Sequence, residues 1–592
     1  MNKIEYDIMN RLLTDPYKNQ RDLAQKCNYS LGMINRSLKH LMEEDYLDEK
    51  MNITAKSVET FSHKKPKNAI ILAAGFGMRM VPINTETPKA FLEIDGEPLI
   101  ERTIRQLHEA GVTKIYIVVG FMKEQFEYLI DEYGVELIVN PDYAAKNNLH
   151  SMKLAAEHLS DTYVIPCDIW CGFNPYRERE LYSWYMVSDL VDNESTVRVN
   201  RKMELVEIPK YQGGNSMVGI SYISAEDAKG IKDRIYEMDK ESCNENEFWE
   251  KALCRENKMI LTARVVSSQD IVEIDTYEEL RELDYQSAQL KTDAITIAAE
   301  ALHAREEDIY DITVLKKGMT NRSFLFSCKE KKYIMRIPGE GTEQLINRAE
   351  EASVYQTIRD KNICDNIIYI NPKTGYKITE YLEGARVCDA FNPEDVQKCM
   401  DRLKGFHQLK LKVDHEFDIF GKTNFYETLW EGKPSVYRDY KKTKEHVFSL
   451  KTFIDEHVSE KILTHIDAVP DNFLFVKNQD GKEEIRLIDW EYAAMQDPHV
   501  DLAMFCIYAL YDRDQVEQLI DAYFTEGCDR KTRVKIYCYI AACGLLWSNW
   551  CEYKRNLGVE FGEYSLRQYR YAKDYYKVAI EGIKELEEND CE

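Results

Sequence analysis

The strongest constraint on the fold is a continuous apolar run, Ala69–Ala74, that leads directly into a glycine-containing loop. A strand that is apolar on both faces is typical of a parallel sheet covered by helices on both sides. Helix-like and strand-like segments then alternate along the chain, over residues 99–110, 114–119, 125–133, 137–140, 151–159 and 163–166. This alternation predicts a doubly wound α/β sheet.

The chain has 592 residues, too many for one core, and its pattern changes on either side of this sheet. Short helices followed by an alternating segment at 47–58 predict three helices and a hairpin, the plan of a winged helix-turn-helix. After residue 292 a β-rich stretch precedes a long helical one, which predicts an α+β bilobal domain. We therefore expect a multidomain chain with a mostly α winged helix at 1–62, an α/β domain at 67–287 and an α+β domain at 292–589.

Charge and cysteine usage exclude several functional classes. The net charge is −25, which argues against a chain that coats nucleic acid or an anionic membrane as a whole. The 15 cysteines include no Cys-x-x-Cys pair, so we expect no zinc site or disulfide framework and a reducing, cytoplasmic location. The N-terminus has no apolar signal sequence, and no apolar run reaches the roughly 20 residues of a membrane helix.

The first candidate site follows the apolar strand. Ala74, Gly75 and Gly77 form a loop whose backbone N–H groups can approach phosphate oxygens closely. Arg79 and Lys89, the latter in a Pro-Lys pair, add positive charge where a pyrophosphate would leave. The combined pattern L-A-A-G-x-G-x-R-x8-P-K resembles nucleotidyltransferases that join a nucleoside triphosphate to a phosphorylated small molecule.

Two carboxylates are the candidate magnesium ligands of this site. Asp168 directly follows the strand at 163–166, at the edge where open α/β sheets bind ligands. Asp275 lies in Val-Glu-Ile-Asp-Thr before a predicted helix. Each has a structural alternative, because Asp168 can cap a turn and Asp275 can cap the following helix.

A finer resemblance concerns the second substrate. The motifs around Asn140–Tyr143, Asn147–Ser151, Trp184 and Phe248 are similar to bacterial CTP:phosphocholine cytidylyltransferases. This resemblance implies that Asn148 lies near the nucleotide, and that Trp184 and Phe248 lie near a trimethylammonium group through cation–π contacts. Ordinary packing of both aromatic residues in the core is the alternative.

The second candidate site is the motif His-x-Asp-x4-Asn, which places Asp467 five residues before Asn472; Asp489 follows in Ile-Asp-Trp-Glu-Tyr. Phosphoryl transfer from ATP requires one carboxylate to orient a hydroxyl and accept its proton, and further oxygen ligands for Mg²⁺. Asp467 is the predicted base, and Asn472 and Asp489 are the predicted metal ligands.

The nucleotide side of this second site departs from protein kinases. Leu315–Asn321 occupies the position of the glycine-rich loop, and Arg336 replaces the usual lysine, with Glu351 as its expected helix partner. These departures resemble choline and ethanolamine kinases, and bacterial choline kinase most closely. The resemblance implies ATP and Mg²⁺ as well as choline.

Aromatic residues near the C-terminus are the candidate choline site. Trp547 and Trp550 lie three residues apart on a predicted helix and therefore on one face. By resemblance they line the choline pocket, although packing in the helical core is the alternative. Glu491 could supply a counter-charge for choline, or be a solvated or metal-side carboxylate.

The combined expectation is a bifunctional choline kinase and CTP:phosphocholine cytidylyltransferase that makes CDP-choline from choline, ATP and CTP with Mg²⁺. Two alternatives remain open: an enzyme for ethanolamine or another amino alcohol, and a transcriptional regulator whose enzyme-like domains sense metabolites. Residues 1–66, the module and the start of its linker, carry 11 Lys/Arg and 10 Asp/Glu, a net of +1, so DNA contact and protein contact both remain open for the module at 1–62. The oligomeric state is not predicted.

Overall fold

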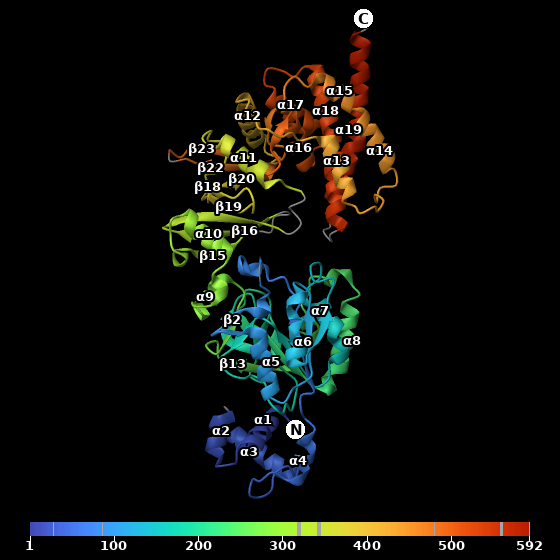
Figure 1. The fold of residues 1–592 in the computed structure, drawn as a ribbon. Coiled ribbons are helices and arrows are strands. Elements are labelled where there is room, and N and C mark those ends of the chain that lie inside the picture. Colours follow the sequence, from blue (N-terminus) through green and yellow to red (C-terminus); the bar gives the residue numbers. More distant parts are fainter. Residues whose placement is uncertain are drawn as a thin grey trace. The chain divides into compact units, whose positions relative to one another are not determined.

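The computed structural model describes residues 1–27, 29–85, 87–315, 321–339, 345–478, 480–556 and 561–590. The chain divides into two compact units, Met1–Thr292 and Asp293–Glu592 (Figure 1). Each unit has its own hydrophobic core. Among the described residues, no helix is both long and apolar enough to cross a bilayer.

Unit 1 begins with the predicted helical module. Its helices are α1 (Lys3–Thr14), α2 (Gln20–Cys27) and α3 (Leu31–Glu43). Asn2 and Glu5 form a capping box at the start of α1. The expected hairpin at 47–58 is wrong: a single bridge joins Leu47 to Ile53, and a fourth helix, α4 (Ala55–Ser62), follows. The Thr54 side chain accepts the Ser57 N–H and so caps α4, which the alternating pattern did not reveal.

The helical module is attached to the α/β domain by shared packing. Leu181 of the α/β domain lies in the same apolar cluster as the side chains of α1, α2 and α3. Asp7 of α1 accepts hydrogen bonds from the hydroxyls of Tyr29, at 2.5 Å, and Tyr182, at 2.7 Å. The rings of Tyr6 and Tyr182 also lie 5.9 Å apart. The module and the α/β domain therefore share one core within unit 1.

The α/β domain contains the predicted doubly wound sheet, in the order β5-β4-β1-β6-β11-β8-β13-β10-β9. Four strands at one side are parallel: β1 (Asn68–Ala73), β4 (Ile115–Val119), β5 (Glu136–Val139) and β6 (Thr162–Pro166). The direction changes at β11 (Gly214–Ile223), which runs antiparallel to β6 and to β8 (Trp184–Asp192). Outside β8 lie β13 (Lys258–Val266), β10 (Glu204–Glu207) and β9 (Val197–Val199).

Helices cover both faces of this sheet, as the continuous apolar strand predicted. Alternate residues of β1 point to opposite sides: Ile71 packs in one apolar cluster and Ile70 in another. The first cluster contains α5 (Leu99–Glu109) and α6 (Tyr128–Tyr133), and the second contains α7 (Asn148–Ala155) and α8 (Ala225–Met238). A final helix, α9 (Tyr277–Leu283), closes the domain.

Unit 2 has a small β-rich lobe and a larger helical lobe. After α10 (Asp293–Ala301), the small lobe forms an antiparallel sheet in the order β15-β16-β17-β19-β18, with α11 (Arg348–Ile358) between β17 and β18. Its strands are β15 (Tyr310–Val314), β16 (Asn321–Cys328), β17 (Lys331–Pro338), β18 (Ile367–Ile370) and β19 (Lys377–Glu380).

The helical lobe carries the second motif in short strands between helices. Those strands are β20 (Arg386–Val387), β21 (Ile462–Thr464), β22 (Phe473–Lys477), β23 (Glu483–Leu487) and β24 (Ala494–Gln496). The helices are α12 (Pro393–Gln408), α13 (Ile419–Thr428), α14 (Tyr440–Ser449), α15 (Lys451–His457), α16 (His499–Tyr508), α17 (Arg513–Tyr523), α18 (Arg530–Asn556) and α19 (Glu563–Asp590).

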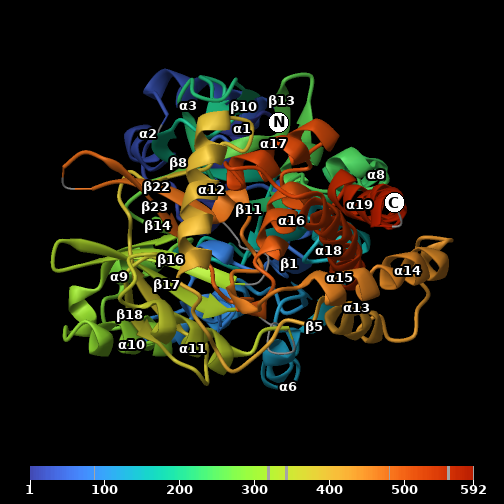
Figure 2. The same ribbon diagram turned by 90° about the horizontal axis from the view of Figure 1, so that it is seen from above.

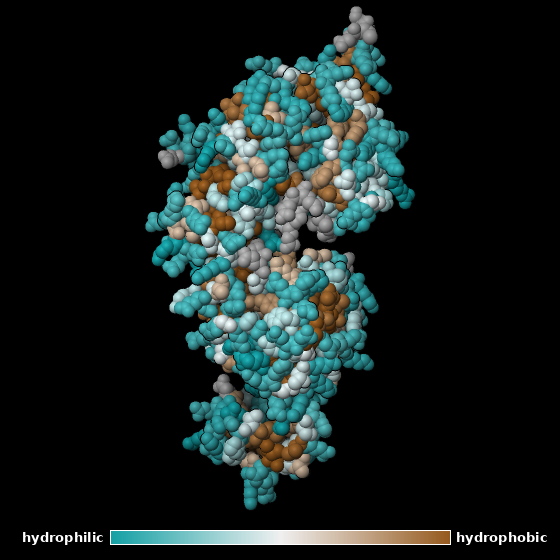
Figure 3. Space-filling model, viewed as in Figure 1, coloured by the Kyte–Doolittle hydropathy of each residue, from teal (hydrophilic) through white to brown (hydrophobic). Residues whose placement is uncertain are grey.

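The central helix of this lobe is α18, which packs against α16, α13 and α19 (Figure 2). Residues 534–550 of α18 are buried, and Ile536–Trp547 within them form a continuous run without charged side chains. Figure 3 shows by contrast that hydrophilic residues cover most of the visible surface of each unit, as expected from a charged fraction of 31%.

The close contact of α18 with α19 gives a prediction for stability. A Cβ added to Gly544 would lie 2.8 Å from the backbone oxygen of Gln568 and 2.8 Å from Cβ of Tyr571. We expect Gly544→Val to lower the free energy of unfolding of unit 2 by about 1–3 kcal/mol, because the added atoms overpack a tight interface. The measurement is urea unfolding followed by far-ultraviolet circular dichroism.

Gly405 of α12 is the matched control. A Cβ there meets nothing within 4 Å, so Gly405→Ala should leave stability unchanged or raise it by about 0.5–1 kcal/mol. Equal stability of Gly544→Val and the unmodified protein would show that α18 and α19 are not closely packed.

Candidate functional sites

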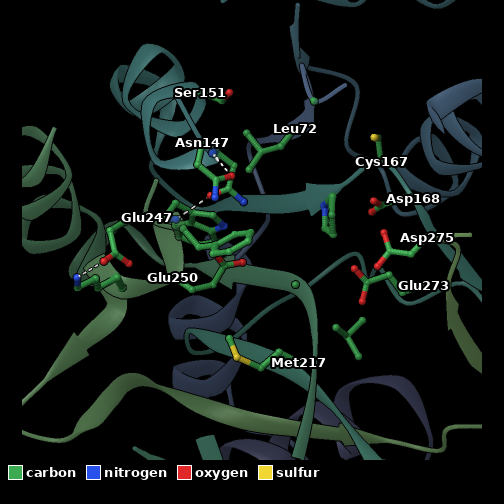
Figure 4. Close-up of a pocket in the computed structure, with 18 of the residues that line it drawn as sticks. Leu72, Asn147, Ser151, Cys167, Asp168, Met217, Glu247, Glu250, Glu273 and Asp275 are labelled. Atoms are coloured by element: carbon green, nitrogen blue, oxygen red, sulfur yellow. Dashed lines mark hydrogen bonds and ion pairs between the residues drawn. The ribbon is translucent and has the colours of Figure 1, made fainter. Parts of the chain in front are cut away.

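The candidate site of unit 1 is a cavity of about 1140 Å³ at the carboxyl ends of β1 and β6 (Figure 4). Open α/β sheets bind ligands at this edge, next to the point where strand order or direction changes. The predicted loop residues Ala74, Gly75 and Gly77 all line it. Gly77 has φ +60, and a Cβ there would lie 3.0 Å from Cγ of Lys89, so both its backbone and its position next to Lys89 favour glycine.

Three carboxylates meet in this cavity, of which the sequence prediction named two. Oxygen atoms of Asp168, Glu273 and Asp275 lie within 4.8 Å of one another. Asp168 follows β6. Glu273 is the last residue of β14 (Ile271–Glu273), which pairs with β7 (Ile169–Cys171), and Asp275 lies two residues after it. Antiparallel pairing of β14 with β7 is what brings Glu273 opposite Ile169, beside Asp168, and sequence spacing alone gave no sign of it.

Cations from the glycine loop and its surroundings neutralise this group. The Lys89 ammonium lies 3.2 Å from Asp168 and also bonds Asp275, and Arg79 lies 2.5 Å from Asp275. Burial alone would lower the pKa of Lys89, but the two aspartates outweigh it and raise that pKa. Desolvation, together with repulsion from Asp168 and Asp275, raises the pKa of Glu273 to about 8.

The cluster of three carboxylates is suited to binding a divalent cation. Its donors are all oxygens, which suit Mg²⁺, and they lie close enough that Asp168 and Asp275 add to the rise in the pKa of Glu273. Asp168, Asp275 and Glu273 are the residues that would hold the ion. Bound there, Mg²⁺ would withdraw charge from a phosphoryl oxygen.

One aromatic prediction for this cavity needs correction. Trp184 points away from the cavity and is 2% exposed; its indole N–H donates to Glu180 at 2.9 Å, and Arg264 stacks on its ring. Because Trp184 and Tyr185 are neighbours on β8, they face opposite sides of the sheet, and it is Tyr185 that lines the cavity. Phe248 does line the cavity and is 59% exposed.

Asn148 also lines the cavity, at the start of α7. Its side-chain oxygen accepts the backbone N–H of Trp249 at 2.8 Å. Asn148 thereby fixes the position of the short helical turn Trp249–Leu253 against the cavity. The sequence analysis assigned no role to Tyr185 or Trp249 and did not predict this turn.

The second motif forms a buried site in unit 2. Ile466 has φ +69 and Asp489 has φ +66, left-handed conformations that cost free energy for residues other than glycine. Asp501 of α16 accepts the backbone N–H groups of His465, at 3.1 Å, and Ile466, at 2.7 Å. It also bonds His407 at 2.9 Å. Asp501 thus holds the chain that presents Asp467, a role that the motif did not predict.

The predicted base is close to its predicted neighbours. The Asn472 amide donates to the side chain of Asp467 at 3.1 Å and to its backbone oxygen at 2.9 Å. Burial, then the charges of Asp489 and Glu491, raise the pKa of Asp467 to about 8. The oxygens of Asn472 and Asp489 are the ligands that would hold Mg²⁺ in this site, and a cation there would offset the repulsion.

A buried ion-pair network lies beside these carboxylates. Arg336 of β17 bonds Glu351 of α11 with both guanidinium nitrogens, at 2.5 and 2.9 Å, so the expected pair is present. Arg348 bonds Glu351 at 3.0 Å, and Lys377 lies 3.7 Å from it. Burial opposes ionisation, but Arg336, Lys377 and Arg348 outweigh it and lower the pKa of Glu351 to about 2.

Glu491 belongs to the same network, which corrects its interpretation as a solvated carboxylate or a free counter-charge. Its side chain is 2% exposed and lies 3.3 Å from Arg348 and 3.7 Å from Arg336. The arginines already balance its charge. Arg348 and Lys377 were not predicted. Arg348 lies one turn from Glu351 on α11, whereas Lys377 of β19 becomes its neighbour only through the packing of the sheet against that helix.

Trp547 and Trp550 lie on one side of α18, as their spacing predicted. Their ring centroids are 5.5 Å apart at 86°, and Tyr492, three residues after Asp489, packs 5.7 Å from Trp547. They are 8% and 3% exposed. Most of the loop predicted to replace the glycine-rich loop, Lys316–Thr320, lies outside the described residues.

Family models match three successive parts of the chain. Residues 1–48 match winged helix-turn-helix DNA-binding, residues 69–171 match the MobA-like NTP transferase domain, and residues 312–539 match choline/ethanolamine kinase. A choline-phosphate cytidylyltransferase of Streptococcus pneumoniae is 35% identical over 29% of this chain and 86% of its own length. This chain belongs to the cytidylyltransferase family. It also carries a winged helix-turn-helix and a choline/ethanolamine kinase domain, so the predicted fold classes are confirmed.

Other relatives of this fused cytidylyltransferase differ in their named substrates. A 2-aminoethylphosphonate cytidylyltransferase of Lancefieldella rimae is 34% identical over 38% of this chain and 94% of its own length. Among solved structures, the choline kinase LicA from Streptococcus pneumoniae is 28% identical, covers 48% of this chain and 98% of its own, and has a TM-score of 0.42. The matches to the two enzyme family models show that the chain is a transferase with a nucleotidyltransferase domain and a kinase domain.

The buried network yields a prediction about stability and its pH dependence. Glu351→Gln removes the anion that pairs Arg336, Arg348 and Lys377, so we expect unit 2 to lose about 3–5 kcal/mol of unfolding free energy at neutral pH. Because the folded-state pKa of Glu351 is lowered to about 2, its contribution is complete above the unfolded pKa near 4.5 and is lost as the pH falls toward 2. The difference between the two proteins in urea unfolding should shrink over that range.

Glu380→Gln is the matched control, on β19 of the same sheet. Glu380 pairs at 2.9 Å with Lys331, which is 62% exposed, so its loss should cost less than about 1 kcal/mol. A Glu351→Gln protein as stable as this control would contradict the assignment of the network.

Proposed function

We propose that the two sites act in succession on one small organic cation. The kinase domain would convert choline and ATP to phosphocholine and ADP, and the cytidylyltransferase domain would convert phosphocholine and CTP to CDP-choline and pyrophosphate. The observation that carries this proposal is the pair of carboxylate sites, one in each unit, each built for magnesium and phosphate chemistry. The product of the first reaction contains the phosphate that attacks in the second.

In the first reaction Asp467 orients the choline hydroxyl and accepts its proton as the oxygen attacks the γ-phosphorus of ATP. Burial and the neighbouring carboxylates raise the pKa of Asp467 to about 8, and a cation held by Asn472 and Asp489 would lower it again and leave the carboxylate ionised, able to accept the proton. Arg336 and Glu351 brace the sheet above the nucleotide. Trp547 and Trp550 would face the trimethylammonium group. This cation cannot donate a hydrogen bond, but it can make cation–π contacts with aromatic rings.

In the second reaction a phosphocholine oxygen attacks the α-phosphorus of CTP, and the bond to the β-phosphate oxygen breaks. Lys89 and Arg79 are the cations available to the leaving pyrophosphate, and they would exchange their carboxylate partners for phosphate oxygens. The N–H groups of Ala74, Gly75 and Gly77 line the same space.

An aminophosphonate is the second candidate acceptor for the cytidylyltransferase domain. The Lancefieldella rimae relative, named for 2-aminoethylphosphonate, favours it. The kinase domain favours a phosphate ester, since a phosphonate needs no kinase. Ethanolamine in place of choline is the corresponding alternative for the kinase domain. Competition between choline and ethanolamine with ATP, and between phosphocholine and 2-aminoethylphosphonate with CTP, distinguishes these substrates.

Product analysis of two variants tests the order of the reactions. With choline, ATP, CTP and Mg²⁺, Asp467→Ala should leave choline unreacted, and Asp168→Ala should accumulate phosphocholine. We expect each loss of rate to be at least about a thousandfold, because each variant removes a group that acts on the reacting atoms. Supplying phosphocholine should restore CDP-choline formation by Asp467→Ala alone.

The two variants control each other, since each alters one unit and leaves the other domain intact. CDP-choline formation from choline by both variants at the rate of the unmodified protein would refute the site assignments. A DNA mobility-shift assay on the same preparations addresses the regulator alternative, which predicts DNA binding without turnover.

A further inference from the structure

His150 is a buried histidine of unit 1 to which the reaction described above gives no role. It lies in the first turn of α7, and its side chain is 8% exposed. Among the described residues, His150 is not one of those that line the cavity, whereas its neighbours Asn147 and Asn148 are. Any effect of His150 on the reaction is therefore transmitted through other residues.

Both ring nitrogens of His150 contact carboxylates. Nδ1 lies 2.7 Å from Asp239, the residue at the end of α8, and Nε2 lies 3.3 Å from Asp142. A neutral imidazole has one N–H and can donate to only one carboxylate, whereas the protonated ring donates to both. The ammonium of Lys153 on α7 lies 3.6 Å from Asp239 and is a further charged group beside this link. The link from Asp142 to Asp239 is therefore complete only when the ring is protonated.

Asp142 belongs to the segment 141–147, which forms part of the cavity wall. Tyr143, Lys146 and Asn147 of this segment line the cavity. The backbone oxygen of Asp142 accepts the N–H of Lys146 at 2.9 Å, so the position of Asp142 determines how the segment turns. The histidine link therefore ties this part of the wall to the end of α8.

The two bonds of the ring differ in length and in exposure. The Asp239 side chain is 13% exposed and lies at the shorter distance, whereas that of Asp142 is 51% exposed. A neutral ring keeps its one N–H toward Asp239, because a buried carboxylate loses more free energy when it is left without a donor. The Nε2 lone pair then faces Asp142 and repels it. Loss of one proton thus releases the cavity wall while α7 and α8 stay joined.

We propose that His150 is a positioning residue whose protonated ring holds the segment 141–147 in the conformation that binds the nucleoside triphosphate. The inference rests on the proposed cytidylyltransferase activity and adds a dependence on pH, since CTP binding weakens as the ring loses its proton. Lys146 moves with this segment, and its ammonium can pair with a phosphate group. Asn148, expected near the nucleotide, directly follows the segment.

The test is the affinity of the full chain for CTP with Mg²⁺, measured by isothermal titration calorimetry at about pH 6 and about pH 8.5. Variants are compared with the unmodified protein at the same pH, which cancels the ionisation of CTP itself. We expect His150→Gln to weaken binding about tenfold at the lower pH and less than about threefold at the higher pH, where the unmodified protein has already lost one bond. The KM of CTP should follow the same pattern, while kcat should change less than about twofold.

Two further variants separate protonation from packing. The amide of Asp142→Asn has the size of the carboxylate, but it can accept from a protonated ring and donate to a neutral one. We therefore expect Asp142→Asn to bind CTP more tightly than the unmodified protein at the higher pH. His108→Gln, on α5 at the opposite face of the sheet, is the control for loss of an imidazole and should bind CTP like the unmodified protein at both pH values. Circular dichroism shows whether each variant is folded.

The outcomes are distinct. No loss of CTP affinity in His150→Gln, or an equal loss at both pH values, would overturn the inference and leave cytidylyl transfer intact. Equal affinities of Asp142→Asn and the unmodified protein at the higher pH would also contradict it. Failure of the unmodified protein to transfer CMP to phosphocholine, phosphoethanolamine or 2-aminoethylphosphonate would instead refute the proposed function, even if CTP binding showed the expected dependence on pH.

Discussion

Crowded carboxylates, and the cations that offset them, are the constraint around which both units are organised. In unit 1 Asp168, Glu273 and Asp275 repel one another, and Lys89 and Arg79 hold them in place. In unit 2 burial, together with the charges of Asp489 and Glu491, raises the pKa of Asp467. Such groups are costly in a low-dielectric interior, so they persist where the surrounding fold fixes their geometry. The sheets and helices described above supply that fixed geometry.

The two units position their carboxylates by different structural means. The cytidylyltransferase domain brings residues distant in sequence to one edge of a sheet, through β6 and the pair β7 and β14. In the kinase domain Asp467 and Asp489 lie in the loops that flank short strands. Asp501 accepts the backbone N–H groups of the two residues before Asp467 and so fixes its position. In both, the reactive side chains stand on backbone that is itself hydrogen-bonded, which limits their movement.

Much of this arrangement could be predicted from sequence because it depends on local pattern. The apolar run at Ala69–Ala74 predicted the parallel sheet, and the spacing of Asp467 and Asn472 predicted that their side chains lie close together. The predictions were wrong where the orientation of a strand, or contacts between elements distant in sequence, determine which side chain reaches the site. Trp184 and Tyr185 have similar residue type and adjacent positions, and only the facing of β8 determines which one reaches the cavity. The sequence left open a role for Glu491 as a counter-charge for choline, but the fold places it beside Arg348 of α11, a pairing that no sequence spacing reveals.

The packing of α1 against Leu181 and Tyr182 has a consequence for how this chain can be divided. Removing the first 66 residues would uncover the Leu181 side chain and leave the Tyr182 hydroxyl without the Asp7 carboxylate. Tyr182 lies two residues before β8, the strand that carries the cavity residue Tyr185. Excision of the winged helix would thus expose an apolar patch next to the start of the strand that carries a cavity residue. Activity measured on the truncated enzyme would therefore represent the intact chain poorly.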